Sequence, residues 1–414
     1  MRTNRIITAL LITLTLTLPA YLPLVGGNVY VTYLCQFLLI AIIMGLWRNN
    51  HSQPQDKWLK FYFIWVALCI LRGFFVAENY MEYKQLWLGS VGLLVPLFLV
   101  LFNDPMRFAT IYKPWCVSLF ILMPFQLCAF PLVSQHYYSP LLILVFFFPF
   151  LNTRLKKWLV IFFVLAFILT GIDSRSQMLK GLLCLFAGLF IKYRKTLSIK
   201  IIKKIHIAGY LSVFLIFGYF LTDAYGVISG KITVEDAQMN NAGQDHMHFD
   251  TRSLLLVDVL NSSIDNGYWI YGNTPARGFE FSASAVLFYD LYDDDAVFNK
   301  GERFKNEMGL TNIYTWTGII GLFLYSMLYF RSTYLAIYKS RNRYVKYLAC
   351  LVAFYWAYGW IEFPTNFGSL DISLWAMIAI CYSEKFRYMT DAEFENWIPS
   401  LLGNSKHKII DIYD

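Results

Sequence analysis

The sequence predicts an all-α membrane protein with about twelve transmembrane helices and one large loop between the ninth and tenth. Of its 414 residues, 57% are hydrophobic and only 15% are charged, whereas soluble domains average about 25% charged residues. The mean hydropathy of +0.48 leaves too little polar surface to cover soluble domains of this size. The same composition excludes disordered, collagen-like and disulfide-scaffold proteins.

Each predicted span is an apolar stretch, and a bilayer core needs about 20 apolar residues per helix. The sixth span is the shortest, and four prolines lie in the hairpin that it forms with the fifth. Such prolines are tolerated in membranes when neighbouring groups satisfy the freed carbonyls. The twelve predicted spans are 6–25, 29–47, 58–76, 86–102, 115–133, 139–151, 156–172, 177–192, 205–222, 309–330, 344–361 and 370–384.

The basic residues predict the orientation of these spans. With the N-terminus in the cytoplasm, 25 of the 35 basic residues fall on the cytoplasmic side. This positive-inside pattern predicts an even number of spans with both termini cytoplasmic. In a bacterial inner membrane, the opposite side is the periplasm. The net charge of +8 is thus explained by topology, and no nucleic-acid partner is expected. A cleaved signal peptide is the alternative for the first segment, but no small-x-small cleavage pattern follows it.

The large loop predicts an ordered periplasmic cap. Residues 223–308 contain 14 acidic and 6 basic residues, so this segment carries a charge of about −8. Thr251 to Ile264 reads as an amphipathic helix, and Asn266 to Glu280 as a packed turn region. The predicted domains are a membrane domain over 1–222, the loop over 223–308, a second membrane part over 309–384 and a cytoplasmic tail over 385–414.

Ionisable residues at the outer face are candidate functional groups, because charges in or beside spans are costly. Arg175 lies in a very short external turn, where it can bind phosphate or pair with Asp173. Arg252 opens the loop helix and Arg277 follows a Gly-rich turn, so each is a ligand or a loop salt bridge. Glu307 stands at the mouth of the tenth span, as a general base or a counter-ion to an arginine.

The order of these elements resembles the O-antigen ligase and polymerase superfamily. The resemblance covers roughly residues 156–330: a Ser-Arg-Ser turn, an Arg on the loop helix, a Gly-rich turn, and a span with Gly318-Ile319-Ile320-Gly321. It implies a metal-independent membrane glycosyltransferase of the GT-C type that uses no cofactor. Its donor would be a glycan on undecaprenyl pyrophosphate at the periplasmic face, and its acceptor the lipid A core or a growing glycan.

The resemblance also implies roles for individual residues. Arg175 and Arg252 match the two family arginines and would hold the pyrophosphate, and Arg277 is a looser match. Family ligases carry a His-Asn pair before the Gly-x-x-Gly, but here the aligned position is Glu307 within Lys305-Asn306-Glu307, so the histidine is absent. The predicted catalytic residues are therefore Glu307, Arg175 and Arg252, and the predicted substrate-binding residues are Arg277, Lys305, Asn306 and Arg72.

Further charged residues near the external loops are weaker candidates for the site. Arg72 stands near Glu78 and Glu82 and can equally belong to a structural ion cluster, while Glu362 and Asp371 flank the last external loop and can line an acceptor pocket. No metal site is expected, because the histidines at 246 and 248 lack a third ligand motif. The rivals are a polysaccharide polymerase of the same superfamily and a transporter of lipid-linked glycans. The sequence shows none of the internal symmetry typical of transporters.

Overall fold

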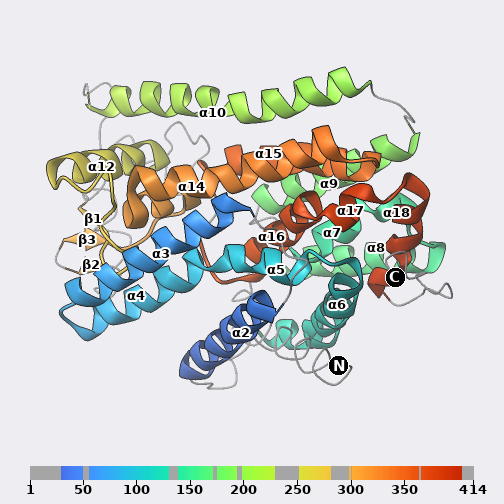
Figure 1. Cartoon of the computed structure of the whole chain (residues 1–414), viewed down its shortest axis with the longest axis horizontal. Coiled ribbons are helices and arrows are strands. Elements are labelled where there is room, and N and C mark those ends of the chain that lie inside the picture. The colour runs from blue at the N-terminus through green and yellow to red at the C-terminus, as the bar shows by residue number, and fades with distance from the viewer. Residues whose placement is uncertain are drawn as a thin grey trace.

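The computed structural model describes residues 29–49, 56–129, 139–170, 175–193, 198–228, 251–280, 298–299, 301–362 and 365–402. Up to residue 228 the described chain forms a succession of helices (Figure 1). They are α2 (Val29–Asn49), α3 (Lys57–Val76), α4 (Tyr80–Leu93), η2 (Val95–Leu97), α5 (Phe98–Phe102), α6 (Pro105–Ala129), α7 (Leu141–Phe146), η4 (Phe148–Phe150), α8 (Thr153–Thr170), α9 (Arg175–Tyr193) and α10 (Ile199–Ile228).

From residue 251 onward, further helices surround a very small sheet. Its strands β1 (Phe279–Glu280), β2 (Phe298–Asn299) and β3 (Glu302–Arg303) are antiparallel in the order β1-β3-β2, with Phe279 and Phe298 both opposite Arg303. The helices are α12 (Thr251–Asp265), α14 (Gly309–Lys339), α15 (Arg343–Tyr358), α16 (Ser369–Tyr382), α17 (Glu384–Tyr388), α18 (Asp391–Trp397) and η5 (Ile398–Leu402).

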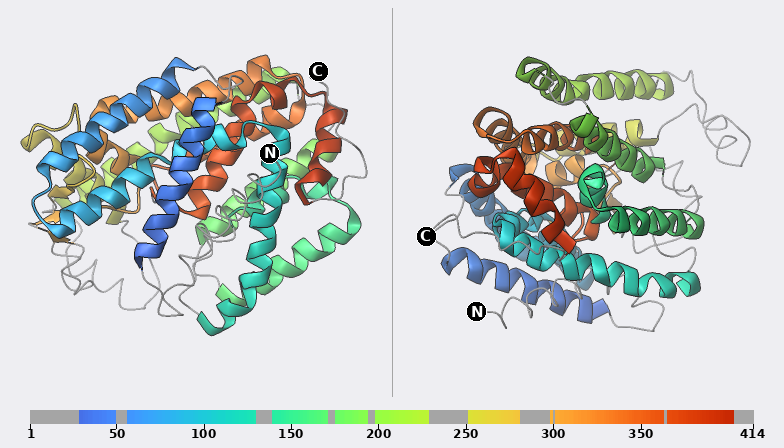
Figure 2. Two further views of the ribbon diagram at one scale, coloured as in Figure 1. Left: turned by 60° about the horizontal axis from the view of Figure 1, so that its bottom comes forward. Right: turned by 90° about the vertical axis from the view of Figure 1, so that its right-hand side faces the viewer.

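The long helices lie roughly side by side, and the bundle has two distinct ends (Figure 1). We call the end with α12 and the three strands the loop end, and the end with α17, α18 and η5 the tail end. The views of Figure 2 show α10 and α2 on opposite outer sides of the bundle, with α5, α14, α15 and α16 between them.

The core is built around α16, whose residues are all buried. This helix packs against α5, α14 and α15, so an all-round apolar sequence fits its position. Because lipid is as apolar as a leucine side chain, such helices associate through close packing and hydrogen bonds. Two of these bonds cross between helices: Trp356 Nε1 donates to Ser326 Oγ at 3.1 Å, and Tyr210 OH bonds Thr333 Oγ1 at 2.9 Å.

The outer helices present apolar surface that suits lipid. Large apolar side chains on α3 and α10 are more than half exposed, Phe75 and Leu215 at 78% each among them. In the described part of the chain, four helices are long and apolar enough to cross a membrane: Lys57–Val76, Tyr80–Phe102, Ile199–Thr222 and Gly309–Lys339. Thr32–Arg48 and Ser369–Tyr382 are shorter apolar helices. The structure is therefore mostly helical and has the surface of a membrane protein.

Several predicted spans differ in shape from single straight helices. The predicted fourth span is divided into α4, η2 and α5, with Pro96 in η2. The predicted sixth span is only the short α7 followed by η4, which contains Pro149. Proline lacks the backbone donor that continues a helix, so both interruptions follow from the sequence. The predicted first span lies outside the described residues.

The segment predicted as a cytoplasmic tail is folded over its first part. Residues up to Leu402 form α17, α18 and η5. Phe386 and Trp397 are buried against Phe108, and the buried Phe394 packs against both of them. Trp397 Nε1 donates to Pro105 O at 3.0 Å. The tail end is thus closed by an aromatic cluster.

Candidate functional site

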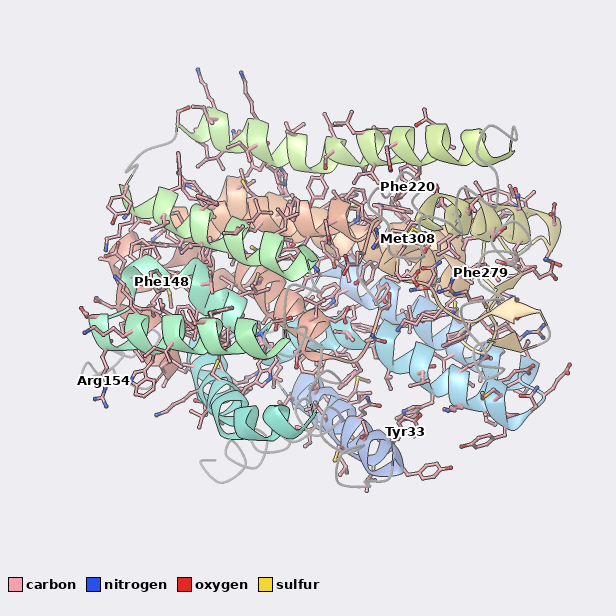
Figure 3. The ribbon with its side chains drawn as sticks, turned by 180° about the vertical axis from the view of Figure 1, so that it is seen from behind. Tyr33, Phe148, Arg154, Phe220, Phe279 and Met308 are labelled. Atoms are coloured by element: carbon pink, nitrogen blue, oxygen red, sulfur yellow. The ribbon has the colours of Figure 1, made fainter. Side chains whose placement is uncertain are left out.

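The loop end is fixed first by an apolar contact beneath α12. The helix predicted over Thr251 to Ile264 is present as α12, and its Leu255 and Val259 are buried with Phe220, Phe279 and Met308. Figure 3 shows Phe220, Phe279 and Met308 gathered at this end of the bundle. The apolar face of α12 thus packs the loop against α10 and the start of α14.

The Gly-rich turn is inserted into a break in α14. Gly318 has φ 68° and ψ −170° inside α14, and Gly272 of the turn has φ 79°. A Cβ on Gly318 would lie 2.2 Å from Ile270 O, so only glycine allows this approach. Ile319 N donates to Trp269 O at 2.9 Å. The break in α14 leaves this N–H without an acceptor in its own helix, and the loop supplies one.

Arg72, predicted to bind substrate, holds this turn from α3. Its guanidinium donates to Tyr271 O at 3.3 Å and to Gly272 O, and it stacks 4.7 Å from the centre of the Tyr271 ring. Trp65, two helical turns earlier on α3, donates through Nε1 to Thr317 O at 2.9 Å. Arg72 and Trp65 thus join α3, the turn and α14.

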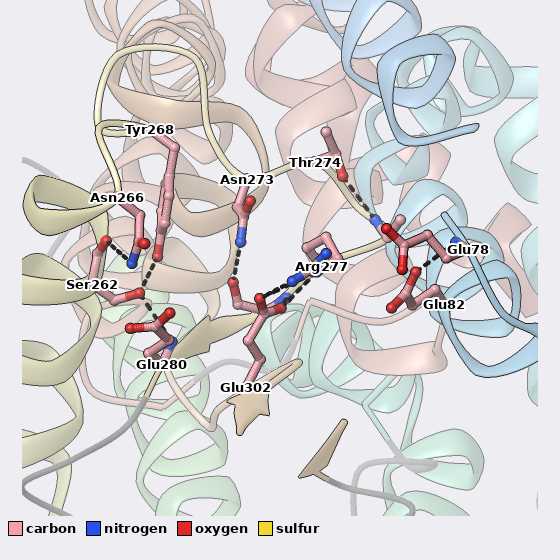
Figure 4. Close-up of polar contacts among 12 residues, drawn as sticks. Glu78, Glu82, Ser262, Asn266, Tyr268, Asn273, Thr274, Arg277, Glu280 and Glu302 are labelled. Atoms are coloured by element: carbon pink, nitrogen blue, oxygen red, sulfur yellow. Dashed lines mark hydrogen bonds and ion pairs between the residues drawn. The ribbon is translucent and has the colours of Figure 1, made fainter. Parts of the chain in front are cut away.

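Arg277, also predicted to bind substrate, forms an ion pair within the loop. Its Nε lies 3.0 Å from Glu302 Oε2, and its Nη2 bonds Glu302 Oε1, so the carboxylate is held by two parallel bonds (Figure 4). Gly278 N also donates to Glu302 Oε2 at 3.0 Å. The hydrogen bonds with Glu302 raise the pKa of Arg277. The arrangement connects the Gly-rich turn to β3.

Asn306 and Lys305 occupy the entrance to α14. Asn306 is buried, and its Oδ1 accepts from Met308 N and Thr311 Oγ1, both at 2.9 Å, so it connects the chain before α14 to the first turn of the helix. Lys305 Nζ donates to Thr365 O at 2.8 Å and to Asn366 Oδ1. Burial lowers the pKa of Lys305 to about 8, and the opposite charge of Asp371 limits this shift.

Arg252, predicted to be catalytic, meets the end of α15. Its Nη2 lies 3.8 Å from Glu362 Oε2, and Tyr358 OH donates to the same oxygen at 3.2 Å. The ring of Tyr358 also contacts Lys180, whose Nζ lies 4.9 Å from the ring centre. Lys180 comes from α9 and is fully buried, so α9, α12 and α15 converge here.

Asp371 connects this group to Lys305. It is buried near the start of α16, and its Oδ2 accepts from Asn366 N at 3.3 Å. Lys180 interacts electrostatically with both Glu362 and Asp371. We call these five residues the loop-end cluster: Lys180, Arg252, Lys305, Glu362 and Asp371. Three cationic side chains therefore lie near two carboxylates at one end of an apolar bundle.

The other two predicted catalytic residues, Glu307 and Arg175, are not part of the loop-end cluster as described. Glu307 is largely exposed and lies 3.0 Å from Arg303 Nη2. The contacts found among the described residues do not join Glu307 to Arg252 or Lys305 directly. Arg175 is the first residue of α9, and its side chain lies outside the described part of the structure. Lys180 follows it on the same helix.

Lys180 is the main residue that the sequence reasoning missed. The sequence did contain an indication of its importance: a lysine near the start of an apolar span is costly unless it is paired. Glu362 and Asp371 were recognised as candidates from their place beside the last external loop. Their meeting with Lys180 depends on packing between helices far apart in the sequence.

A small pocket lies next to the cluster, between α14 and α15. Its volume of about 10 Å³ corresponds to roughly one water molecule. Thr365, whose carbonyl accepts from Lys305, lines it together with Tyr325, Tyr329, Tyr355 and Trp356. The pocket is too small for a sugar.

Comparison with family models, with curated proteins and with solved structures finds no match for this chain.

Proposed function

We propose that the protein is a membrane glycosyltransferase that moves a glycan from a lipid pyrophosphate to an acceptor hydroxyl. The loop-end cluster carries the proposal, because it brings three cationic groups and two carboxylates to the end of an apolar bundle. This is where the pyrophosphate of a polyprenyl carrier such as undecaprenyl pyrophosphate would lie if its chain ran in the bilayer. The proposed location is the periplasmic face of a bacterial inner membrane.

The cationic groups suit the leaving group of this reaction. Breaking the bond between the sugar C1 and the pyrophosphate leaves negative charge on the phosphate oxygens. Arg252 and the buried Lys180 stand on neighbouring elements that share Tyr358 and Glu362. Preorganised cations stabilise such developing charge without reorganising during the reaction. Arg252 and Lys180 would bind the pyrophosphate, and Lys305 would bind a neighbouring oxygen; Arg175 stays a predicted contributor from the start of α9.

A carboxylate would orient the acceptor hydroxyl and accept its proton. Glu362 shares the cluster with Arg252 and Tyr358, whereas Glu307 is paired with Arg303. We therefore assign the base to Glu362 and keep Glu307 as the alternative. Asp371 is buried beside Lys305 and would hold that lysine in place.

The test is transfer of a lipid-linked glycan by the purified protein in proteoliposomes. Glu362→Gln keeps the size of the side chain and removes the base, so transfer should fall by about 10²- to 10⁴-fold. Glu307→Gln is the matched control and should stay within a few-fold of the wild type. The reverse result would move the base to Glu307, and wild-type transfer by both variants would exclude glycosyl transfer at the loop end.

A transporter of lipid-linked glycans is the second candidate, because α14 is interrupted at Gly318. Broken helices are common at the binding sites of transporters. Here, however, the freed Ile319 N is bonded to Trp269 O, so it is used to attach the loop. Movement of the lipid-linked glycan across the vesicle membrane, without formation of a new glycosidic bond, would favour the transporter. A polymerase differs from a ligase only in the acceptor, a growing glycan instead of the lipid A core.

A further inference from the structure

Two lysines converge on one carbonyl at the tail end, far from the loop-end cluster. Lys156 Nζ of α8 donates to Pro149 O at 3.0 Å, and Lys192 Nζ of α9 donates to the same oxygen at 2.8 Å. We call Lys156 and Lys192 the lysine pair. Both ammonium groups touch the same neutral oxygen, so two like charges are held within a few ångströms of each other.

The backbone around Pro149 explains this convergence. A Cβ on Gly188 would lie 2.1 Å from Phe146 O, so the glycine lets α9 pack directly on the end of α7. Lys192 follows Gly188 by one helical turn and therefore reaches the next carbonyls of η4. Carbonyls at the end of a helical segment lack a partner within it and attract cations.

The surrounding charge is one-sided. Between Asp104 and Asp223 the sequence contains a single acidic residue, Asp173. Asp391 and Glu395 at the tail end lie 3.4 and 3.3 Å from the Arg343 guanidinium, and Asp104 lies 2.6 Å from Lys385 Nζ. Within the described ranges, no carboxylate forms an ion pair with the lysine pair. The like charges thus favour an additional anion beside the lysine pair.

The surface beside the lysine pair has the character of a lipid interface. Trp158 is 55% exposed and Tyr193 is 74% exposed, and apolar side chains such as Phe186 continue this surface along α9. Exposed tryptophan and tyrosine are typical of the boundary between the headgroups and the hydrocarbon. Figure 3 shows Phe148 at the same end as Arg154, and the centre of the Phe148 ring lies 5.8 Å from Lys156 Nζ.

We propose that the lysine pair binds the phosphate group of an anionic phospholipid in the leaflet at the tail end. Each ammonium has three N–H donors and uses one on Pro149 O, so the others can bond phosphate oxygens. The aromatic and apolar surface on α8 and α9 receives the glycerol and acyl chains. This apolar surface favours a lipid headgroup over free phosphate. The site is independent of glycosyl transfer at the loop end.

Native mass spectrometry of the full-length protein in detergent tests this site. The protein is mixed separately with phosphatidylglycerol, phosphatidylcholine and inorganic phosphate. The double variant Lys156→Gln/Lys192→Gln should bind phosphatidylglycerol about tenfold or more weakly than the wild type, given the contribution of each lysine near a membrane surface. The control Arg154→Gln/Lys157→Gln removes the same charge from the start of α8 but leaves both ammonium groups on Pro149 O, so it should weaken binding much less than the lysine double variant.

Three results would overturn the proposal. They are equal binding of phosphatidylglycerol by the wild type and the lysine double variant, equal loss in the control variant, and phosphatidylcholine bound as tightly as phosphatidylglycerol. Displacement of phosphatidylglycerol by equimolar inorganic phosphate would instead identify a site for a soluble anion. If the double variant does not fold, Lys192→Gln alone, on an exposed side chain, should weaken binding about fivefold.

Discussion

Charged side chains are arranged differently at the two ends of the bundle. At the tail end, two ion pairs each join one acid to one base: Asp56 with Arg331 at 3.0 Å, and Asp104 with Lys385 at 2.6 Å. At the loop end, Lys180 is fully buried and lies near two carboxylates: Glu362, which also pairs with Arg252, and Asp371, which also lies near Lys305.

This difference separates charges that support the fold from charges that suit a ligand. Exposed one-to-one pairs contribute at most about 1 kcal/mol each. Ionisable groups inside an apolar bundle are costly and mark candidate functional sites. The loop-end cluster is therefore the binding site that we propose, whereas Asp56–Arg331 and Asp104–Lys385 are one-to-one structural contacts.

The largest expected effect comes from Lys180. Lys180→Met keeps the length of the side chain and removes the charge, so glycan transfer should fall by about 100-fold while the protein stays inserted. Arg331→Gln removes a tail-end cation and should leave transfer unchanged. Transfer rates in proteoliposomes measure both, and equal loss in the two variants would end the distinction between the ends.

The next effect concerns the attachment of the loop. Gly318→Ala places a Cβ against Ile270 O and forces a positive φ on alanine, so the free energy of unfolding should fall by more than about 2 kcal/mol. Gly218→Ala on α10 is the control, since its Cβ would meet nothing within 4 Å. Thermal unfolding in detergent compares the two, and similar curves would mean that the break in α14 is not needed.

The lowered pKa of Lys305 predicts that the rate of glycan transfer depends on pH. Burial lowers its pKa from 10.5 to about 8, so above that pH the folded protein loses a cation that a pyrophosphate needs. Between about 8 and 10.5 the unfolded chain binds more protons than the folded one, so the Lys305 contribution to stability rises with pH. Transfer should therefore decline above pH 8.

A pH–rate profile of the wild type and of Lys305→Arg tests this expectation. Arginine stays charged, so the variant should keep its rate to higher pH. Identical profiles would show that Lys305 does not control the decline.

The smallest effect is expected at the tail end. Lys385→Gln breaks the contact with Asp104, and the free energy of unfolding should change by no more than about 1 kcal/mol. Glycan transfer should remain at the wild-type rate. A loss of transfer measured in the same proteoliposomes would contradict the assignment of function to the loop end.

Much of the fold is visible in the sequence, because apolar runs and amphipathic periods are local signals. The helix over Thr251 to Ile264 was predicted almost to its ends, and the packed turn after Asn266 is present. The folded tail was missed, since Phe394 and Trp397 read as isolated aromatic residues until α6 and α15 lie beside them. The break at Gly318 was also missed, because a glycine in an apolar run does not reveal its φ.

The site was predictable only in part. Arg252 was identified from its place at the start of a loop helix, and the structure adds its carboxylate, Glu362. Arg277 and Arg72 were predicted as ligand groups, and the structure shows them bonded to Glu302 and to loop carbonyls. Such partners depend on the tertiary path of the chain, which residue type and spacing do not contain.

The contact between the Gly-rich turn and α14 is made by backbone atoms, which has a consequence for how the protein can diversify. Trp269, Ile270 and Tyr271 contribute carbonyl or amide groups to the attachment, while their side chains remain 41 to 48% exposed. Substitutions of Trp269 and Ile270 can therefore change the exposed surface of this turn while the backbone bonds that attach it to α14 remain.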